Sequence, residues 1–154
     1  MSIEHMKKRI TRVLFIGFVG VLFSSAALAA EYLSVTTDNA NVRTGPGTNY
    51  PASMELFKGY PLQVLKKEGE WYKIADFEKD SGWIHESIVK KCDSVIVNAK
   101  KSLNMRAGAT TKDAVVADVE RGVVLTKIET KGKWTKVKHS SGTTGWIYNP
   151  LLWP

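Results

Sequence analysis

After residue 30, apolar and polar residues alternate in short runs, and these runs predict β-strands along the rest of the chain. Clear examples lie around Leu62 to Leu65, Trp71 to Ala75 and Gly82 to Ile84, with the glycine-containing connections "EGE" and "EKDSG" between them. Alternation with a period of two is typical of antiparallel strands that bury one face. No run after residue 30 keeps a helical period. The residues expected in the core are Leu62, Val64, Trp71 or Tyr72, Ile74 and Ile84.

The strand pattern occurs twice, at a constant spacing of 63 residues. Gly-Trp-Ile stands at 82–84 and again at 145–147, and the surrounding sequence aligns without a gap. Self-similarity at a fixed period indicates a duplicated structural unit. Two domains are therefore expected, residues 31–92 and 93–154. About five short strands in each would close into a small barrel, because closure removes exposed sheet edges. The further identical pairs include Asn41 and Asn104, Arg43 and Arg106, Gly45 and Gly108, Gly59 and Gly122, Leu62 and Leu125, Gly69 and Gly132, and Trp71 and Trp134.

The first 29 residues have the composition of an export signal rather than of a folded segment. Basic residues at positions 7, 8, 9 and 12 precede the apolar run "VLFIGFVGVLF", and Ala27-Leu28-Ala29 supplies the small-residue cleavage pattern. The apolar run is shorter than the roughly 20 residues that a membrane-spanning helix needs. We expect a cleaved signal peptide at 1–29, and an exported protein, periplasmic or extracellular, that is not integral to the membrane. An uncleaved anchor is the alternative.

Four sequence features, repeated in the same order in both copies, resemble the bacterial SH3-like domain family. They are an Asn-x-Arg strand with a loop after it ("NVRTGPGTNY" and "LNMRAGATTKD"), a Lys-Gly or Arg-Gly turn, a Trp-x-Lys strand and the Gly-Trp-Ile triplet. The resemblance implies an all-β fold of two tandem small SH3-like β-barrels after the signal peptide. It also implies an exported protein, since the family often serves as a targeting module for peptidoglycan beside a hydrolase domain.

Export, duplication and this resemblance together predict a non-catalytic binding protein. Its expected partner is cell-wall peptidoglycan, its stem peptides or another envelope component, and no cofactor is expected. Two copies on one chain would raise the apparent affinity for a repeating polymer if both can reach it. The alternative is a periplasmic adaptor that holds another envelope protein.

The candidate ligand-binding residues are polar and aromatic side chains on the strands and loops. An Arg two residues after an Asn could form a fork on a carboxylate, although a local bond that fixes the next loop is the favoured interpretation. Tyr50 and the strand-starting tryptophans offer flat contact area. In contrast, the tryptophans of the repeated triplet, Trp83 and Trp146, are expected mainly to pack, because the preceding glycine allows close approach. The candidates are Asn41, Arg43, Tyr50 and Trp71 in the first copy, and Asn104, Arg106 and Trp134 in the second.

Cys92 is the single cysteine, so the chain cannot form an internal disulfide. A catalytic thiol needs a base to hold it as thiolate, and only His85 and His139 follow the signal, neither in a catalytic sequence context. No enzymatic activity and no metal site are expected. A plain structural role is favoured for Cys92, and a Cys92-linked dimer is the alternative.

Charge divides the two copies. The whole chain carries +7, but residues 31–92 hold 8 Lys and Arg against 9 Asp and Glu, whereas residues 93–154 hold 10 against 5. A basic half can indicate nucleic acid binding, but export argues against that partner. A solvated outer sheet face is the favoured interpretation of the lysines, and acidic wall polymers or lipid head groups are the alternative.

Overall fold

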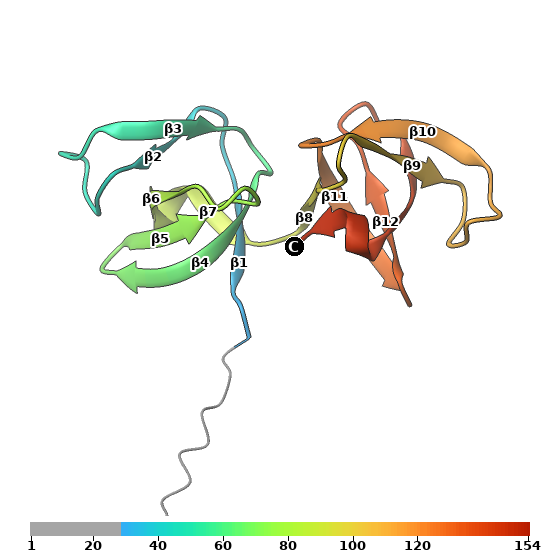
Figure 1. Cartoon of the computed structure of the whole chain (residues 1–154). Helices are drawn as coiled ribbons and strands as arrows, with labels where there is room; N and C mark the ends of the chain where they lie inside the picture. Colours follow the sequence, from blue (N-terminus) through green and yellow to red (C-terminus); the bar gives the residue numbers. More distant parts are fainter. Residues whose placement is uncertain (1–28) are drawn as a thin grey trace, which may run out of the picture.

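The computed structural model describes residues 29–154 and shows two β domains side by side (Figure 1). The predicted signal lies outside the described residues except for Ala29. No helix in the described part is long and apolar enough to cross a membrane. The first domain contains β1 (Tyr32–Val35), β2 (Ala40–Arg43), β3 (Ala52–Leu56), β4 (Pro61–Glu68), β5 (Trp71–Ala75), β6 (Ser81–His85), the 3-10 turn η1 (Glu86–Ile88) and β7 (Val89–Lys91). The second contains β8 (Ser94–Val97), β9 (Ser102–Arg106), β10 (Val115–Glu120), β11 (Val124–Lys131), β12 (Trp134–Lys138), β13 (Thr144–Tyr148), η2 (Asn149–Leu151) and β14 (Leu152–Trp153).

Each domain is one curved antiparallel sheet of seven strands, two more than the sequence predicted. The strand order is β3-β2-β6-β5-β4-β1-β7 in the first domain and β10-β9-β13-β12-β11-β8-β14 in the second. The expected closure is not found, since β3 and β7 in one domain, and β10 and β14 in the other, remain unpaired edges. One edge of each sheet is a very short strand: β7 has three residues and β14 has two. Like closure, a short edge limits the number of unpaired backbone N–H and C=O groups that could pair with another chain.

The core of each domain lies on the concave side of its sheet. Of the predicted core positions, Leu62, Ile74 and Ile84 are fully buried, and Val64 and Tyr72 are partly buried. The alternation of apolar residues therefore identified the buried face correctly. The first core consists of Val35, Ala40, Val42, Leu56, Leu62, Ile74 and Ile84. The second consists of Val95, Val97, Ala99, Leu103, Met105, Val119, Leu125, Val137 and Ile147.

The two long hairpins, β4–β5 and β11–β12, share the same irregularity. The pairing register shifts between Val64 and Lys66 in one and between Lys127 and Glu129 in the other. The residues at the two bulges, Leu65 and Ile128, are aligned in the repeat and both are 49% exposed. A bulge increases local twist, which helps the hairpin to curve around its core. The two copies therefore share even the position of the β-bulge in the long hairpin.

The glycine of each Gly-Trp-Ile triplet makes room for a core side chain rather than for the indole. Gly82 and Ile84 face the core, and Trp83 points to the other face of the sheet, as the period of a strand requires. A Cβ at Gly82 would lie 2.4 Å from Val42 Cγ1 and 3.0 Å from the carbonyl oxygen of Arg43. The aligned Gly145 meets Met105 and the carbonyl oxygen of Arg106 in the same way. Trp83 is 8% exposed and packs beneath the Lys66 ammonium.

Replacing Gly82 by alanine is expected to lower the free energy of unfolding of the first domain by about 1–3 kcal/mol, because an added methyl group overpacks a filled core. One of the clashing atoms belongs to the backbone, so a side-chain rotation cannot relieve the contact. Urea unfolding of Gly82→Ala and wild type measures the difference. Ser81→Ala, at the exposed neighbouring position, is the control, and an equal stability for the two variants would contradict the close-approach argument.

The loop between β5 and β6 is fixed by the buried carboxylate of Asp76. Its Oδ1 accepts hydrogen bonds from the backbone N–H groups of Glu78 and Asp80, both at 2.9 Å. The Tyr60 hydroxyl donates to its other oxygen at 3.5 Å. Burial, and after it the negative charge of Asp76, raise the pKa of Tyr60 above its ordinary value of 10.0. The folded domain therefore holds the Tyr60 proton more tightly than the unfolded chain.

This raised pKa predicts alkaline destabilisation that Tyr60→Phe should reduce. Above about pH 10 the unfolded chain loses the Tyr60 proton while the folded domain keeps it, so the stability conferred by this group is constant below pH 10 and falls as the pH rises. Urea midpoints measured between pH 9 and pH 11.5 should fall more steeply for wild type than for Tyr60→Phe. Parallel pH dependences would show that Tyr60 is not responsible.

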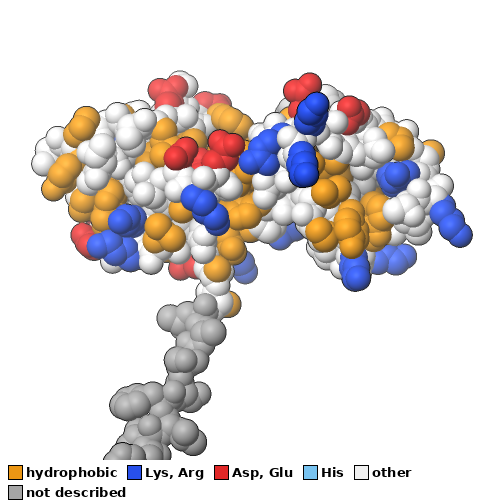
Figure 2. Space-filling model, in the orientation of Figure 1, with side chains coloured by type: hydrophobic (Ala, Val, Ile, Leu, Met, Phe, Trp, Pro, Cys, Tyr) orange, Lys and Arg blue, Asp and Glu red, His pale blue; other side chains and the backbone are white. Residues whose placement is uncertain are grey.

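The two domains meet along a polar seam. The Ser34 and Ser94 hydroxyls, both buried, lie 2.6 Å apart across it. The Arg121 guanidinium of the second domain stacks 4.9 Å from the Phe77 ring centre and lies 3.4 Å from the Glu78 carboxylate. Figure 2 shows this meeting of acidic and basic side chains between the domains. At the other end, the rings of Tyr32 and Trp153 pack edge to face at 5.5 Å.

Candidate functional site

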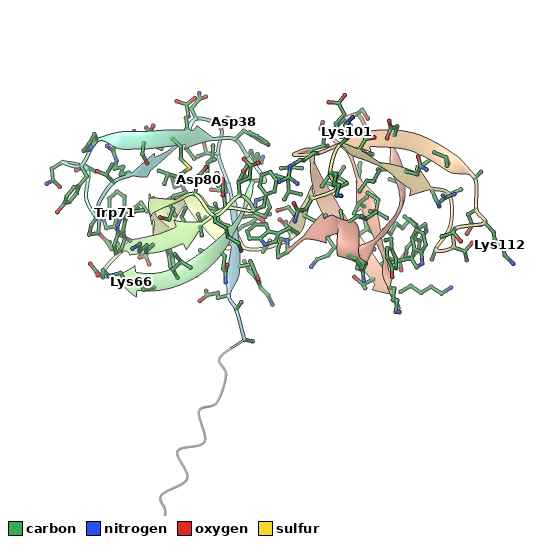
Figure 3. The ribbon with its side chains drawn as sticks, in the orientation of Figure 1. Asp38, Lys66, Trp71, Asp80, Lys101 and Lys112 are labelled. Atoms are coloured by element: carbon green, nitrogen blue, oxygen red, sulfur yellow. The ribbon has the colours of Figure 1, made fainter. Side chains whose placement is uncertain are left out.

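A groove of about 430 Å³ lies on the first domain, where β2, β5 and β6 approach one another. Three of the four residues predicted for this domain, Asn41, Arg43 and Trp71, line it together. The groove is also lined by Asp38, His85 and Ile88. Trp71 lies on the side of the first domain away from the second (Figure 3), so the groove is open to a ligand without separation of the domains.

Arg43 has a local structural bond as well as a place in the groove. Its Nη1 donates a hydrogen bond of 2.8 Å to the carbonyl oxygen of Tyr50, which fixes the loop after β2. Arg106 does the same in the second domain, donating from Nη1 to the carbonyl oxygen of Asp113 at 2.9 Å. A guanidinium has five N–H donors, so this bond leaves others for a carboxylate or a carbonyl. The favoured interpretation of a local bond is therefore confirmed, and the bond leaves further donors of each guanidinium available.

Tyr50 is the predicted residue that the structure places outside the groove. Its ring lies against Gly45, where a Cβ would approach Cδ1 to 2.4 Å, and its side chain is 41% exposed. In the second domain the carboxylate of Asp113 occupies the corresponding space beside Gly108 and accepts a hydrogen bond from the Thr110 hydroxyl. The Tyr50 ring therefore packs inside the loop that carries it. The aligned loop of the second domain holds a carboxylate in the same place instead of an aromatic ring.

His85 also lines the groove, although it is not among the residues predicted from the sequence to bind a ligand. It is the cross-strand partner of Trp71, and the two rings meet edge to face with centres 5.1 Å apart. Its Nδ1 lies 2.8 Å from the Ser87 hydroxyl, and its Nε2 lies 3.6 Å from the Glu70 carboxylate. The repeat could have indicated His85, because the aligned residue 63 positions later, Tyr148, also has a flat ring. In the structure Tyr148 packs against Trp134 as His85 packs against Trp71.

The second domain presents the same frame. Asn104 and Arg106 lie on β9 as Asn41 and Arg43 lie on β2, with a fully buried residue between them in each case. Trp134 and Tyr148 are register partners on β12 and β13, with ring centres 5.6 Å apart. The three residues predicted for this domain, Asn104, Arg106 and Trp134, therefore hold the positions that line the groove in the first.

Cys92 lies in the seam between the domains, half buried, and contacts serines. Its Sγ lies 3.3 Å from the carbonyl oxygen of Ser94 and 3.4 Å from the Ser34 hydroxyl. The Nδ1 atoms of His85 and His139 lie 2.8 Å from the hydroxyls of Ser87 and Ser141, each two residues further along the chain. Within residues 29–154, no group of three or more His, Cys, Asp or Glu side chains is arranged to hold a metal ion.

The comparison with protein families gives the same division of the chain. A family model described as "Bacterial SH3 domain" matches twice, at residues 36–91 and 99–154. The chain belongs to the bacterial SH3 domain family. Each match contains one copy of the groove residues, and together they cover most of the described part.

The relatives of these bacterial SH3 domains include proteins named as cell-wall enzymes. One, from Bacillus subtilis (strain 168), bears the name of an N-acetylmuramoyl-L-alanine amidase, YrvJ, and is 29% identical over 92% of this chain. Another, from Staphylococcus aureus, is named as a cell wall amidase, LytH, and is 34% identical over 47% of this chain. The chain spans only 30% and 25% of these relatives' own lengths. Among solved structures, NlpC1 of Trichomonas vaginalis matches with a TM-score of 0.35 and 16% identity, over 85% of this chain and 48% of its own.

Proposed function

We propose that this chain is an exported, non-catalytic protein whose two bacterial SH3 domains bind cell-wall peptidoglycan, most directly through its peptide stems. The observation that carries the proposal is the first-domain groove, in which Asn41, Arg43 and Trp71 converge beside His85. The names of the relatives that share these domains support the cell wall as the target.

The groove suits an extended peptide rather than a deeply enclosed small molecule. An amide side chain and a guanidinium can pair with peptide carbonyls, N–H groups or a carboxylate. The indole of Trp71 provides a flat apolar surface for the chain between these polar points. Such a site binds each unit with modest affinity and can bind the same unit wherever it recurs along a polymer. A domain that attaches to the cell wall needs both properties.

The seam between the domains supports a role in binding without catalysis. Cys92, the one residue with a nucleophilic sulfur, has serine contacts and lies in the seam, and it does not line the groove. A catalytic thiol works with a base positioned to take its proton, whereas the hydrogen-bond partners of the Cys92 thiol among the described residues are the Ser34 hydroxyl and the carbonyl oxygen and hydroxyl of Ser94.

Two copies of the binding residues on one chain increase binding to a polymer. Once one domain is bound, the second binds as an intramolecular event, and apparent affinity can rise by a factor of about 10² to 10⁴. The contacts along the seam hold the two domains in one arrangement, so less orientational freedom is lost when the second domain binds.

Co-sedimentation of the purified mature protein with isolated sacculi tests the proposal. We expect most of the protein in the pellet at low salt, with no soluble muropeptide released during the incubation. Recovery of all the protein in the supernatant would refute wall binding. Release of muropeptides would refute the non-catalytic part. A pull-down from envelope extract that returns one stoichiometric protein, without sacculus binding, would instead favour the adaptor function.

A further inference from the structure

The groove of the first domain and the aligned surface of the second domain, called the second groove below, share a frame of side chains but differ in charge at their rims. The shared frame consists of the Asn, the Arg and the aromatic pair, and these are matched in kind between the domains. At three aligned rim positions the second domain is more positive by five charges in total. These positions are Thr37 and Lys100, Asp38 and Lys101, and Glu70 and Lys133.

The acidic rim of the first groove is held in place by the fold. Asp38 lines the groove, and its Oδ1 accepts a hydrogen bond of 3.0 Å from the backbone N–H of Lys58. Glu70 directly precedes Trp71, and its carboxylate lies 3.6 Å from His85 Nε2. Asp38 therefore lines the groove itself, and Glu70 stands beside the aromatic pair at its edge.

The lysines at the rim of the second groove have no ion-pair partner among residues 29–154. Lys101 directly precedes β9 and Lys133 directly precedes Trp134, so both stand where Asp38 and Glu70 stand in the first domain. Neither these two lysines nor Lys100 forms an ion pair with any residue of the described part. Figure 3 shows Asp38 and Lys101 at the same upper edge of their domains.

Charges at the rim of a binding site contribute more to its specificity than to its affinity. Complementary charge favours the correct partner, and like charge disfavours the wrong one. The guanidinium occurs in both grooves and does not distinguish them. Screening at physiological salt limits the effect to about 8 Å, so only charges beside the groove contribute to the choice.

We propose that the two grooves bind groups of opposite charge: the second binds a carboxylate of the wall peptide, and the first binds a free amine. The inference rests on the proposed function, because a peptide stem can present both groups. Lys101 and Lys133 are then the specificity-determining residues of the second groove, and Asp38 and Glu70 are those of the first.

The test uses sacculi in three forms: untreated, with amines acetylated, and with carboxylates converted to neutral amides. Lys101→Asp with Lys133→Glu gives the second groove the rim of the first. We expect this double variant to bind untreated sacculi about tenfold more weakly, an effect on the scale of two exposed ion pairs. It should also lose most of the wild-type sensitivity to carboxylate amidation. Asp38→Lys with Glu70→Lys should instead lose the sensitivity to amine acetylation.

The matched control is Lys127→Glu with Lys138→Glu, which changes the net charge by the same amount. Lys138 lies at the other end of β12 from Trp134, about 13 Å along the strand. If this control weakens binding as much as the rim variant, overall charge is the cause and the inference is overturned.

Equal binding of the rim variants and wild type to all three forms of sacculi also overturns the inference, while the proposed function stands. If wild type does not sediment at all, the proposed function fails and the inference falls with it. Equal melting temperatures for all the variants verify that each is folded.

Discussion

Ile84→Ala is expected to lower the free energy of unfolding of the first domain by about 2–5 kcal/mol, which is the usual cost of deleting a buried isoleucine side chain. Ile84 is fully buried and packs with six other core residues of a domain of only about 60 residues. A core of that size supplies about 3–5 kcal/mol in total. The variant should therefore lose most of the stability of its first domain. Urea unfolding followed by tryptophan fluorescence measures the loss.

Two matched variants accompany this measurement. Ile147→Ala deletes the aligned residue and should destabilise the second domain by a comparable amount. Ile128→Ala removes the same atoms from a bulge position that is 49% exposed, and it should stay within about 0.5 kcal/mol of wild type. Losses of similar size at Ile84 and Ile128 would mean that the triplet does not anchor the core.

Trp71→Ala is expected to weaken binding to sacculi by about 30-fold, the effect of losing 2 kcal/mol at an aromatic centre of a binding surface. Trp134→Ala should have an effect of similar size. The double variant should lose more than either, because the gain from simultaneous binding of both grooves disappears. Binding isotherms from the sedimentation assay, at one fixed salt concentration, give these ratios directly.

Phe57→Ala is the control for the tryptophan variants. Phe57 is an aromatic residue of the first domain with 48% exposure, and it does not line the groove. Its loss should leave sacculus binding within about twofold of wild type, since truncation outside the centre of a binding surface has little effect. A weakening as large as that of Trp71→Ala would show that the wall contacts a different face of the domain.

The fold could be predicted from the sequence because its signals are local and repeated. Alternation placed Leu62, Ile74 and Ile84 in the core, and the spacing of the triplets gave two copies of one unit. Closure could not be predicted in this way, since it depends on whether edge strands far apart in sequence come within hydrogen-bonding distance. They do not, and one edge of each sheet, β7 or β14, is a strand of only three or two residues.

The site was only partly predictable for a related reason. Asn41, Arg43 and Trp71 were found because their residue types suit recognition and because each recurs in the second copy. His85 was missed because its role comes from cross-strand pairing with Trp71, which is a matter of register. The loop that places Tyr50 outside the groove depends on contacts with Gly45 that spacing alone does not reveal.

Because the two long hairpins share the same bulge, the hairpin of one domain has the backbone geometry needed to replace that of the other. Residues 61–75 and 124–138 have the same length, the same register shift and the same positive-φ glycine at the turn, Gly69 or Gly132, each with φ of 57°. An exchange of one hairpin for the other would therefore preserve strand geometry while moving a tryptophan from one sheet to the other. Chains that carry two copies of one hairpin would have the same residue before the tryptophan in both domains, either Glu70 or Lys133, while Asp38 and Lys101 would stay unlike because they lie outside the exchanged segment.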